Sequence, residues 1–234
     1  MSPIARRAWR RGRSPSGLVL AAALLACAIP TAPRAEVAVA RVTGGDRYGA
    51  GVVWSARDGL VLTALHTVEA AAELRVSVGG APEVPARLVE ADPALDLALL
   101  RASGPLGPAT PLALRSSPLV PGDRVRMLGY PRLRAVAAEA RVLDPSRRFA
   151  GARYLELAGQ AEPGASGGPV IDAAGAVVGI VDVVLTDRGS TLAIPIDAAL
   201  VRFPVGARET PPLAPPPVAA GDAGQGAARL RARD

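Results

Sequence analysis

Three short segments of the sequence carry residue types that could together cleave an acyl bond. His66, the only histidine, lies in LTALHTV, Asp96 lies in ALDLALL, and Ser166 lies in GASGGPV. A neutral serine hydroxyl is a poor nucleophile and needs a base that titrates near neutral pH, which among unperturbed side chains is histidine. The imidazole in turn needs a carboxylate that fixes its tautomer and stabilises its cation. The three residue types therefore indicate nucleophilic acyl transfer.

Each of these residues also has an ordinary explanation when it is taken alone. His66 fits a partly buried histidine, Asp96 fits a solvated turn residue close to Asp92-Pro93, and Ser166 fits a flexible glycine-rich loop. However, an acid among aliphatic residues is costly to bury without a partner, which favours pairing of Asp96 with an imidazole. The apolar run after Ser166 predicts a strand, and a flexible linker seldom leads straight into one. The combination is therefore more specific than its members.

The glycine-rich segment around Ser166 could also bind the charge that develops on a substrate. Gly164 leaves room for a carbonyl group, and the backbone N–H groups of Gly164 and Ser166 could serve as a pair of oxyanion donors. Loss of one such donor by mutation costs about 3–4 kcal/mol. A single histidine excludes a multi-histidine metal site, and the only cysteine, Cys27, lies near the N-terminus. We therefore expect no metal site and no cofactor.

The elements that would position these residues are predicted to be short strands. Half of the 234 residues are apolar but only 3% are aromatic, so valine, leucine and alanine have to fill the core. Apolar runs separated by turn signals predict twelve strands and a closing helix. They are Val37–Val42, Gly49–Ser55, Leu60–Ala64, Leu74–Val78, Ala86–Glu90, Leu97–Arg101, Arg124–Leu128, Ala135–Leu143, Ala152–Leu157, Pro169–Asp172, Val177–Val184, Ser190–Ile194 and the helix Pro195–Phe203.

Six strands fall on each side of a Pro/Gly/Ser-rich connector, residues 103–123. We therefore predict an all-β fold of two tandem six-stranded antiparallel β-barrels with a short C-terminal helix, because closed barrels leave no free edges. The globular domain would span residues 36–205, with its first barrel at 36–102 and its second at 124–205. The proline- and glycine-rich tail, 206–234, is predicted to be disordered.

Residues 1–35 have the layout of an export signal. A basic stretch precedes the apolar run 18–29, which is shorter than the ~20 residues that a membrane-spanning helix needs. This run favours a cleaved signal peptide, while Leu24–Cys27 also resembles a lipobox that would leave a lipid on Cys27. Both alternatives predict export to the periplasm or beyond, with membrane attachment only through the lipid or an uncleaved leader. The leader holds six arginines and no acid, so the net charge of +6 becomes 0 without it, and no nucleic-acid partner is expected.

The segments TALHTV, DLALL and GASGGPV resemble the signature segments of trypsin-like serine proteases of the chymotrypsin fold, in the order His, Asp, Ser. The bacterial HtrA/Deg-like branch is the most similar, here without a PDZ domain. Gly49–Val53, Leu128–Pro131 and Leu192–Ile196 also match it. The resemblance implies an exported serine endopeptidase with proteins or peptides as substrates. Ser166 would be the nucleophile, His66 the general base and Asp96 its orienting carboxylate, with the Gly164 and Ser166 N–H groups as the oxyanion hole.

Three positions depart from the family pattern or affect what it implies. Leu65 stands where a small residue usually precedes the histidine, and Ala165 replaces the usual Asn or Asp before the serine. Gln160 lies where the resemblance places the floor of the specificity pocket, and a neutral residue there does not predict cleavage after Arg or Lys. Leu65 and the missing PDZ domain leave open an alternative, a catalytically silent peptide-binding or scaffold module. The sequence sets neither the oligomeric state nor the physiological substrate.

Overall fold

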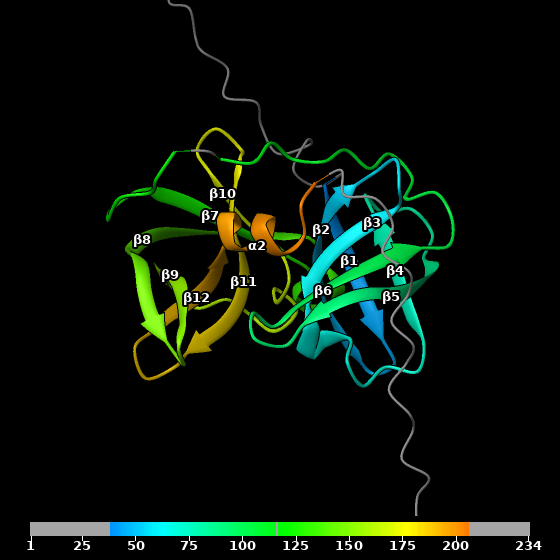
Figure 1. Ribbon diagram of the computed structural model, residues 1–234, viewed down its shortest axis with the longest axis horizontal. Helices are drawn as coiled ribbons and strands as arrows, with labels where there is room; N and C mark the ends of the chain where they lie inside the picture. Colours follow the sequence, from blue (N-terminus) through cyan, green and yellow to red (C-terminus); the bar gives the residue numbers. More distant parts are fainter. Residues whose placement is uncertain (1–37, 116, 206–234) are drawn as a thin grey trace, which may run out of the picture.

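The structure is a computed structural model that describes residues 38–115 and 117–205, whose strands close into two barrels lying side by side (Figure 1). All strand pairs within the barrels are antiparallel. The predicted leader with Cys27 and the predicted tail lie outside the described residues. The predicted fold class, two six-stranded antiparallel barrels with one short C-terminal helix, is confirmed.

The N-terminal barrel has the strand order β1-β2-β3-β6-β5-β4. Alternating aliphatic residues of these strands point inward and form a core of its own, which includes Val42, Val61 and Leu100. The strands are β1 (Val39–Gly44), β2 (Arg47–Ser55), β3 (Leu60–Ala64), β4 (Leu74–Val78), β5 (Val84–Asp92) and β6 (Leu97–Ala102), and the 3₁₀-helix η1 (Leu65–Thr67) follows β3 directly.

The C-terminal barrel repeats this architecture with the order β10-β11-β12-β9-β8-β7 and a second core that includes Met127, Leu157 and Val170. Its strands are β7 (Arg124–Gly129), β8 (Val136–Phe149), β9 (Ala152–Ala158), β10 (Pro169–Asp172), β11 (Val177–Leu185) and β12 (Ser190–Pro195). A 3₁₀-helix, η2 (Pro131–Leu133), lies between β7 and β8, and α2 (Ile196–Arg202) closes the domain.

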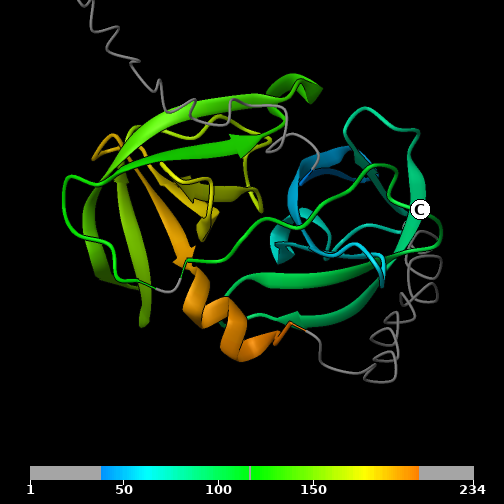
Figure 2. The same cartoon turned by 90° about the horizontal axis from the view of Figure 1, so that it is seen from above.

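A third apolar cluster joins the two barrels, with residues such as Leu62 from the first and Ile194 from the second. The helix α2 lies across this junction (Figures 1 and 2). The Trp54 indole N–H donates to the Phe203 carbonyl over 3.0 Å. Arg202 at the end of α2 forms ion pairs with Glu90 and Asp92 of β5. The C-terminal helix therefore fixes the second barrel against the first.

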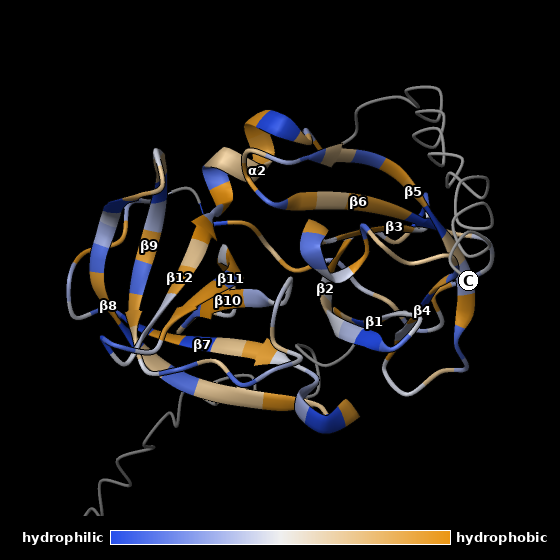
Figure 3. Ribbon diagram, turned by 90° about the horizontal axis from the view of Figure 1, so that it is seen from below, coloured by the Kyte–Doolittle hydropathy of each residue, from blue (hydrophilic) through white to orange (hydrophobic). Residues whose placement is uncertain are grey.

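Strand β8 is longer than the sequence predicts, because it continues past Leu143 to Phe149. The segment Asp144–Arg148 is polar and contains Pro145, a residue that disfavours a strand. It still pairs with β9, with register shifts between Val142 and Arg147 that accommodate it. Figure 3 shows hydrophilic and hydrophobic segments alternating along β8, as expected for a strand with one wet face.

Of the residues described, no helix has the length and apolar character required to cross a membrane.

Candidate active site

His66 lies in the 3₁₀-turn η1, immediately after strand β3. The preceding Leu65 is buried in the apolar core of the N-terminal barrel. The next residue but one, Val68, also enters that core. The two apolar anchors turn the His66 side chain out of the barrel, and 44% of it remains exposed. Leu65, which departs from the family pattern, therefore packs into the core.

Asp96 holds the His66 segment at three points. It occupies the left-handed region with φ at +52°, which asparagine and aspartate tolerate better than other residues with a Cβ. Its carbonyl accepts the Leu65 N–H at 2.8 Å, and its Oδ1 accepts the His66 backbone N–H at 3.0 Å. Its Oδ2 forms a short hydrogen bond with Nδ1 of the His66 ring. These contacts fix both the backbone and the ring of the histidine. The sequence analysis expected the contact with the ring, and the catalytic role of the pair stays a prediction.

The charges of the pair shift both pKa values in the direction that favours ionisation. The hydrogen bond to Asp96 raises the pKa of His66 above 6.5, against the opposing effect of burial. For Asp96, burial acts to raise the pKa, but the hydrogen bonds with His66 and the contact with Asp182 outweigh it, so the pKa is lowered. The imidazolium form of His66 is therefore stabilised, which is what a base needs after it has taken a proton.

The Ser166 loop is held through its backbone. The Ala50 N–H of β2 donates to the Ser166 carbonyl at 2.9 Å, and the Gly167 N–H donates to the Val181 carbonyl of β11 at 2.8 Å. A Cβ on Gly168 would lie 2.0 Å from the Leu128 carbonyl oxygen, so only glycine fits there. The small residues of GASGGPV therefore allow the loop to pack tightly against both barrels.

This packing brings the Ser166 loop against the segment that carries His66. A Cβ on Gly49 would touch both the Ser166 carbonyl oxygen and Thr67 of η1, each at 2.9 Å. A Cβ on Gly167 would lie 2.6 Å from the Ala64 backbone nitrogen, at the end of β3. The three segments predicted to carry chemistry thus meet at the junction of the barrels. Among the described residues the Ser166 hydroxyl has no hydrogen-bond partner.

Gly164 adopts a conformation that requires glycine, with φ at +100°. Its carbonyl accepts the Tyr130 N–H at 3.0 Å, and a Cβ there would lie 2.7 Å from both the Tyr130 carbonyl and the Tyr48 ring. Ala165 is buried against Gly129, so the position that departs from the usual Asn or Asp makes an apolar contact. Within residues 38–115 and 117–205, the N–H groups of Gly164 and Ser166 donate to no protein acceptor.

A third carboxyl group, which the sequence analysis missed, belongs to this site. Asp182 of β11 is only 6% exposed, and one of its side-chain oxygens lies within 4.8 Å of a ring nitrogen of His66 and a carboxylate oxygen of Asp96. Burial and the contact with Asp96 raise the pKa of Asp182 to about 7. An acid inside the apolar run GIVDVVL is the signal that could have found it. The expectation that the site holds no metal stays a prediction.

Gln160, the residue predicted to lie at the floor of the specificity pocket, is exposed. Its amide donates to the Thr186 carbonyl at 3.3 Å. Its role in specificity stays a prediction.

An open groove of about 1070 Å³ runs beside His66, Asp96 and Asp182, with β9 residues and the helix residue Ala198 on its other sides. Its lining combines these three titratable groups with apolar residues such as Phe149 and Val183.

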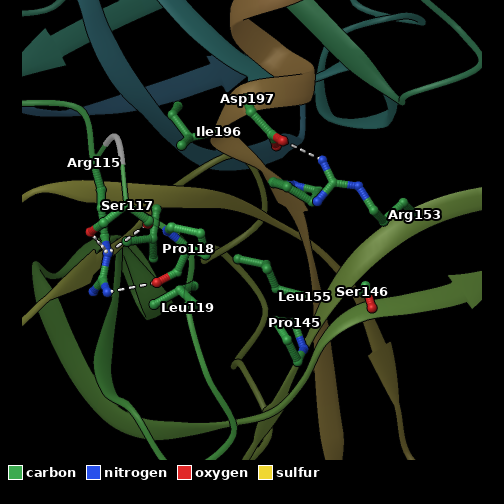
Figure 4. A pocket seen from close by; sticks show the side chains of 12 residues that line it. Arg115, Ser117, Pro118, Leu119, Pro145, Ser146, Arg153, Leu155, Ile196 and Asp197 are labelled. Carbon is green, nitrogen blue, oxygen red and sulfur yellow. Dashed lines mark hydrogen bonds and ion pairs between the residues drawn. The ribbon is translucent and has the colours of Figure 1, made fainter.

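A second hollow, of about 380 Å³, lies between the connector, β8 and the start of α2 (Figure 4). Arg153 is paired with Asp197 there, and Arg115 is paired with Asp172. Both cations of this hollow are therefore already neutralised by acids.

The sequence matches one known protein family. A family model described as a trypsin-like peptidase domain matches residues 49–180. A relative from Pseudomonas putida, named a probable periplasmic serine endoprotease DegP-like, is 34% identical over 182 residues, which are 73% of this chain and 36% of the relative. A protein of the same name from Pseudomonas fluorescens is 32% identical over the same share of each chain. The chain thus spans about a third of the length of these curated relatives.

Solved structures show the same fold. The HtrA-type protease AlgW with a tripeptide superposes with a TM-score of 0.66 at 29% identity, covering 72% of this chain and 59% of that one. The inactive form of Rv3671c protease from Mycobacterium tuberculosis gives a TM-score of 0.64 at 26% identity, covering 74% of this chain and 91% of that one.

Proposed function

Because the chain belongs to the family of trypsin-like peptidase domains, we propose that it is an exported serine endopeptidase that hydrolyses peptide bonds through an acyl-enzyme. The observation that carries this proposal is the set of three hydrogen bonds between Asp96 and the segment Leu65–His66, together with the packing of the Ser166 loop against the same segment. The names of the curated relatives and the export signal predicted in residues 1–35 support the periplasm as its location.

In the proposed reaction Ser166 Oγ attacks the scissile carbonyl carbon while His66 Nε2 takes the hydroxyl proton. Asp96 keeps the Nδ1 hydrogen facing its own Oδ2, so that Nε2 is the free base. The negative charge that forms on the carbonyl oxygen is bound by the Gly164 and Ser166 N–H groups. His66 then returns the proton to the leaving amine, and water hydrolyses the acyl-enzyme by the same route.

In this proposal the groove beside His66 receives the polypeptide substrate. Its volume is about 1070 Å³, and Phe149 and Val183 are among the apolar residues that line it. We propose proteins or peptides as substrates on this basis, with no cofactor in the reaction.

Covalent labelling with a fluorophosphonate probe tests the proposed function directly. The wild-type chain should be labelled, and Ser166→Ala should not be, because the probe reacts only with an activated serine hydroxyl. His66→Ala should lose labelling as completely, since residues that act as a unit are not additive. Ser146→Ala, at an exposed serine on β8, is the matched control and should be labelled like wild type.

Absence of labelling in the folded wild-type chain would contradict the proposed peptidase activity and favour a catalytically silent peptide-binding module. Labelling that persists in Ser166→Ala would place the nucleophile elsewhere in the chain.

A further inference from the structure

Asp182 lies at the back of the proposed catalytic pair, at an irregularity of strand β11. The register of β11 against β12 shifts between Val181 and Val183, so Asp182 sits at a bulge. The preceding Val181 exchanges backbone hydrogen bonds with Gly167 and Gly168 of the Ser166 loop, each over 2.8 Å. The strand that carries Asp182 is thus tied directly to the loop that carries the nucleophile.

We propose that Asp182 carries a proton that it shares with Asp96, and that it thereby acts as a positioning residue for the His66–Asp96 pair. This inference rests on the proposed function, and it adds a third titratable group to the site. It is carried by the position of the Asp182 side chain, whose polar atoms lie within 4.8 Å of those of His66 and Asp96.

The hydrogen-bond inventory of the buried carboxyl oxygens supports a proton at this place. Asp182 Oδ2 is buried and has no donor, and it is the one carboxyl oxygen in that condition among the described residues. An ionised carboxylate only accepts hydrogen bonds, so two neighbouring carboxylates cannot satisfy one another. A proton on one of them turns the repulsion into a hydrogen bond, as in other carboxyl pairs that share a site. The unpaired oxygen of Asp182 then becomes a donor to Asp96.

The surroundings of the two acids decide which of them holds the proton. Asp96 already accepts the backbone N–H and the ring of His66, and both contacts favour its charged form. Asp182 is buried and forms no ion pair with any arginine of the described residues. Burial, followed by the contact with Asp96, raises the pKa of Asp182 to about 7, while the pKa of Asp96 is lowered. The proton therefore resides on Asp182 at acid pH and is lost as the pH rises through neutrality.

The other titratable groups that face Asp182 come from η1 and β9. His66 and the Tyr154 hydroxyl both act to lower the pKa of Asp182, but burial outweighs them. Burial and the nearby Asp182 raise the pKa of Tyr154 to about 12, so its hydroxyl stays a neutral donor. The strand partners of the bulge in β12 are Leu192 and Ala193, which do not titrate.

Loss of the Asp182 proton changes the site in a defined direction. Once ionised, Asp182 places a second negative charge near His66, and this charge raises the pKa of the imidazole. The three groups then titrate as one unit, with macroscopic steps that belong to the set. A site without this carboxyl should show a simple histidine titration at lower pH.

The single histidine of the chain makes the test unambiguous, since every imidazole NMR signal belongs to His66. The full chain with labelled histidine is titrated from pH 4 to 10 as Ser166→Ala, which prevents self-cleavage, with and without Asp182→Asn. In Asp182→Asn we expect the midpoint pH of the His66 titration to fall. We also expect the titration curve to take the form of a single ionising group. Asp172→Asn removes an equally buried carboxyl of the same barrel, paired with Arg115, and should leave the midpoint unchanged.

Kinetic measurements distinguish the hydrogen bond that residue 182 donates to Asp96 from the charge that Asp182 carries. Asparagine at 182 can still donate to Asp96, so Asp182→Asn should keep kcat within a few-fold at its plateau. Asp182→Leu fills a similar volume without a donor and should lose about tenfold in kcat with little change in KM, the effect of one hydrogen bond to a charged group. If the leucine variant does not fold, the asparagine titration decides.

A His66 midpoint that is the same with and without Asp182→Asn overturns the shared proton, even if the probe labels the chain in which Ser166 is intact. A midpoint that falls as expected, while the chain with Ser166 intact resists the probe, contradicts the proposed function and leaves the shared proton standing. The two failures are therefore distinguishable.

Discussion

The two barrels hold their halves of the site by different means. On the N-terminal barrel, Asp96 binds the His66 segment through one backbone carbonyl and two carboxylate oxygens. On the C-terminal barrel, the Ser166 loop is fixed by backbone hydrogen bonds and by close contacts that admit only glycine. The side chain of Ser166 has no hydrogen-bond partner among the described residues, whereas the side chain of His66 has one.

This difference assigns separate tasks to the two barrels. In the proposed mechanism the acid–base half is oriented before substrate arrives, because Asp96 already binds the His66 ring and raises its pKa. In the same proposal the C-terminal half offers the substrate a Ser166 hydroxyl that has no hydrogen-bond partner among the described residues. Such preorganisation is the main source of electrostatic stabilisation in acyl transfer, since no reorientation is needed during reaction. Mutations in the two halves should therefore fail in different ways.

The largest effect is expected from Asp96→Asn, which breaks the acid–base half while preserving its shape. Asparagine also tolerates the left-handed backbone at this position and can keep the backbone contacts. Its amide cannot stabilise the imidazolium and favours the wrong ring tautomer, so kcat should fall about 10⁴-fold. Rates of peptide hydrolysis and of fluorophosphonate labelling measure this loss.

Asp144→Asn on β8 makes the same change at a carboxyl that binds the Ser146 N–H and does not line the groove beside His66, so this variant should keep full activity. A loss of less than tenfold in Asp96→Asn would show that the histidine does not depend on this acid.

The same comparison explains what could be predicted from the sequence. His66, Asp96 and Ser166 are recognisable because each lies in a short local pattern, and the barrels follow from apolar runs of strand length. Asp182 was missed because its partners are 86 and 116 positions earlier in the chain, and only the closed barrels bring β11 beside them. The long β8 was missed because pairing with β9 overrides the local signal of Pro145.

Gly164→Ala is the next test, and it addresses the C-terminal half. The new Cβ would lie 2.7 Å from the Tyr130 carbonyl, at a φ of +100° that residues with a Cβ disfavour, so the loop has to move. Displacement of one oxyanion donor should lower kcat about 10²–10³-fold with a smaller change in KM. Kinetics with a peptide substrate distinguish the two constants.

Gly175→Ala is the matched control, because Gly175 has a φ of +82° in the open turn between β10 and β11. It carries similar backbone strain with no atom within 4 Å of the new Cβ. A drop in kcat of equal size in both variants would mean that strain in the barrel, and not the oxyanion donor, limits turnover.

The smallest expected effect is a pH dependence of the free energy of unfolding. It depends on the charges of His66 and Asp96 on the N-terminal barrel and of Asp182 on the C-terminal barrel. Because the pKa of His66 is raised in the folded chain, its contribution to the free energy of unfolding is fully present below pH 6.5. This contribution is lost as the pH rises through the pKa of the folded state. Asp182, raised from 3.8 to about 7, likewise binds its proton more tightly in the folded chain, so stability falls as the pH rises across this interval. Because the pKa of Asp96 is lowered, its charged form stabilises the folded chain above the usual pKa of aspartate, and this contribution is lost only in stronger acid.

Between pH 5 and 8 the two raised values act in the same direction, so urea unfolding of Ser166→Ala should show a higher midpoint at pH 5 than at pH 8. Activity should change in the opposite sense, because the base has to be neutral, and kcat/KM should fall as the pH drops through the raised pKa of His66. Asp182→Asn removes one of the two groups and should flatten the stability profile without reversing it. A midpoint that rises from pH 5 to 8 would mean that the folded chain binds these protons less tightly than the unfolded chain, against the burial of Asp182 and the hold of Asp96 on His66.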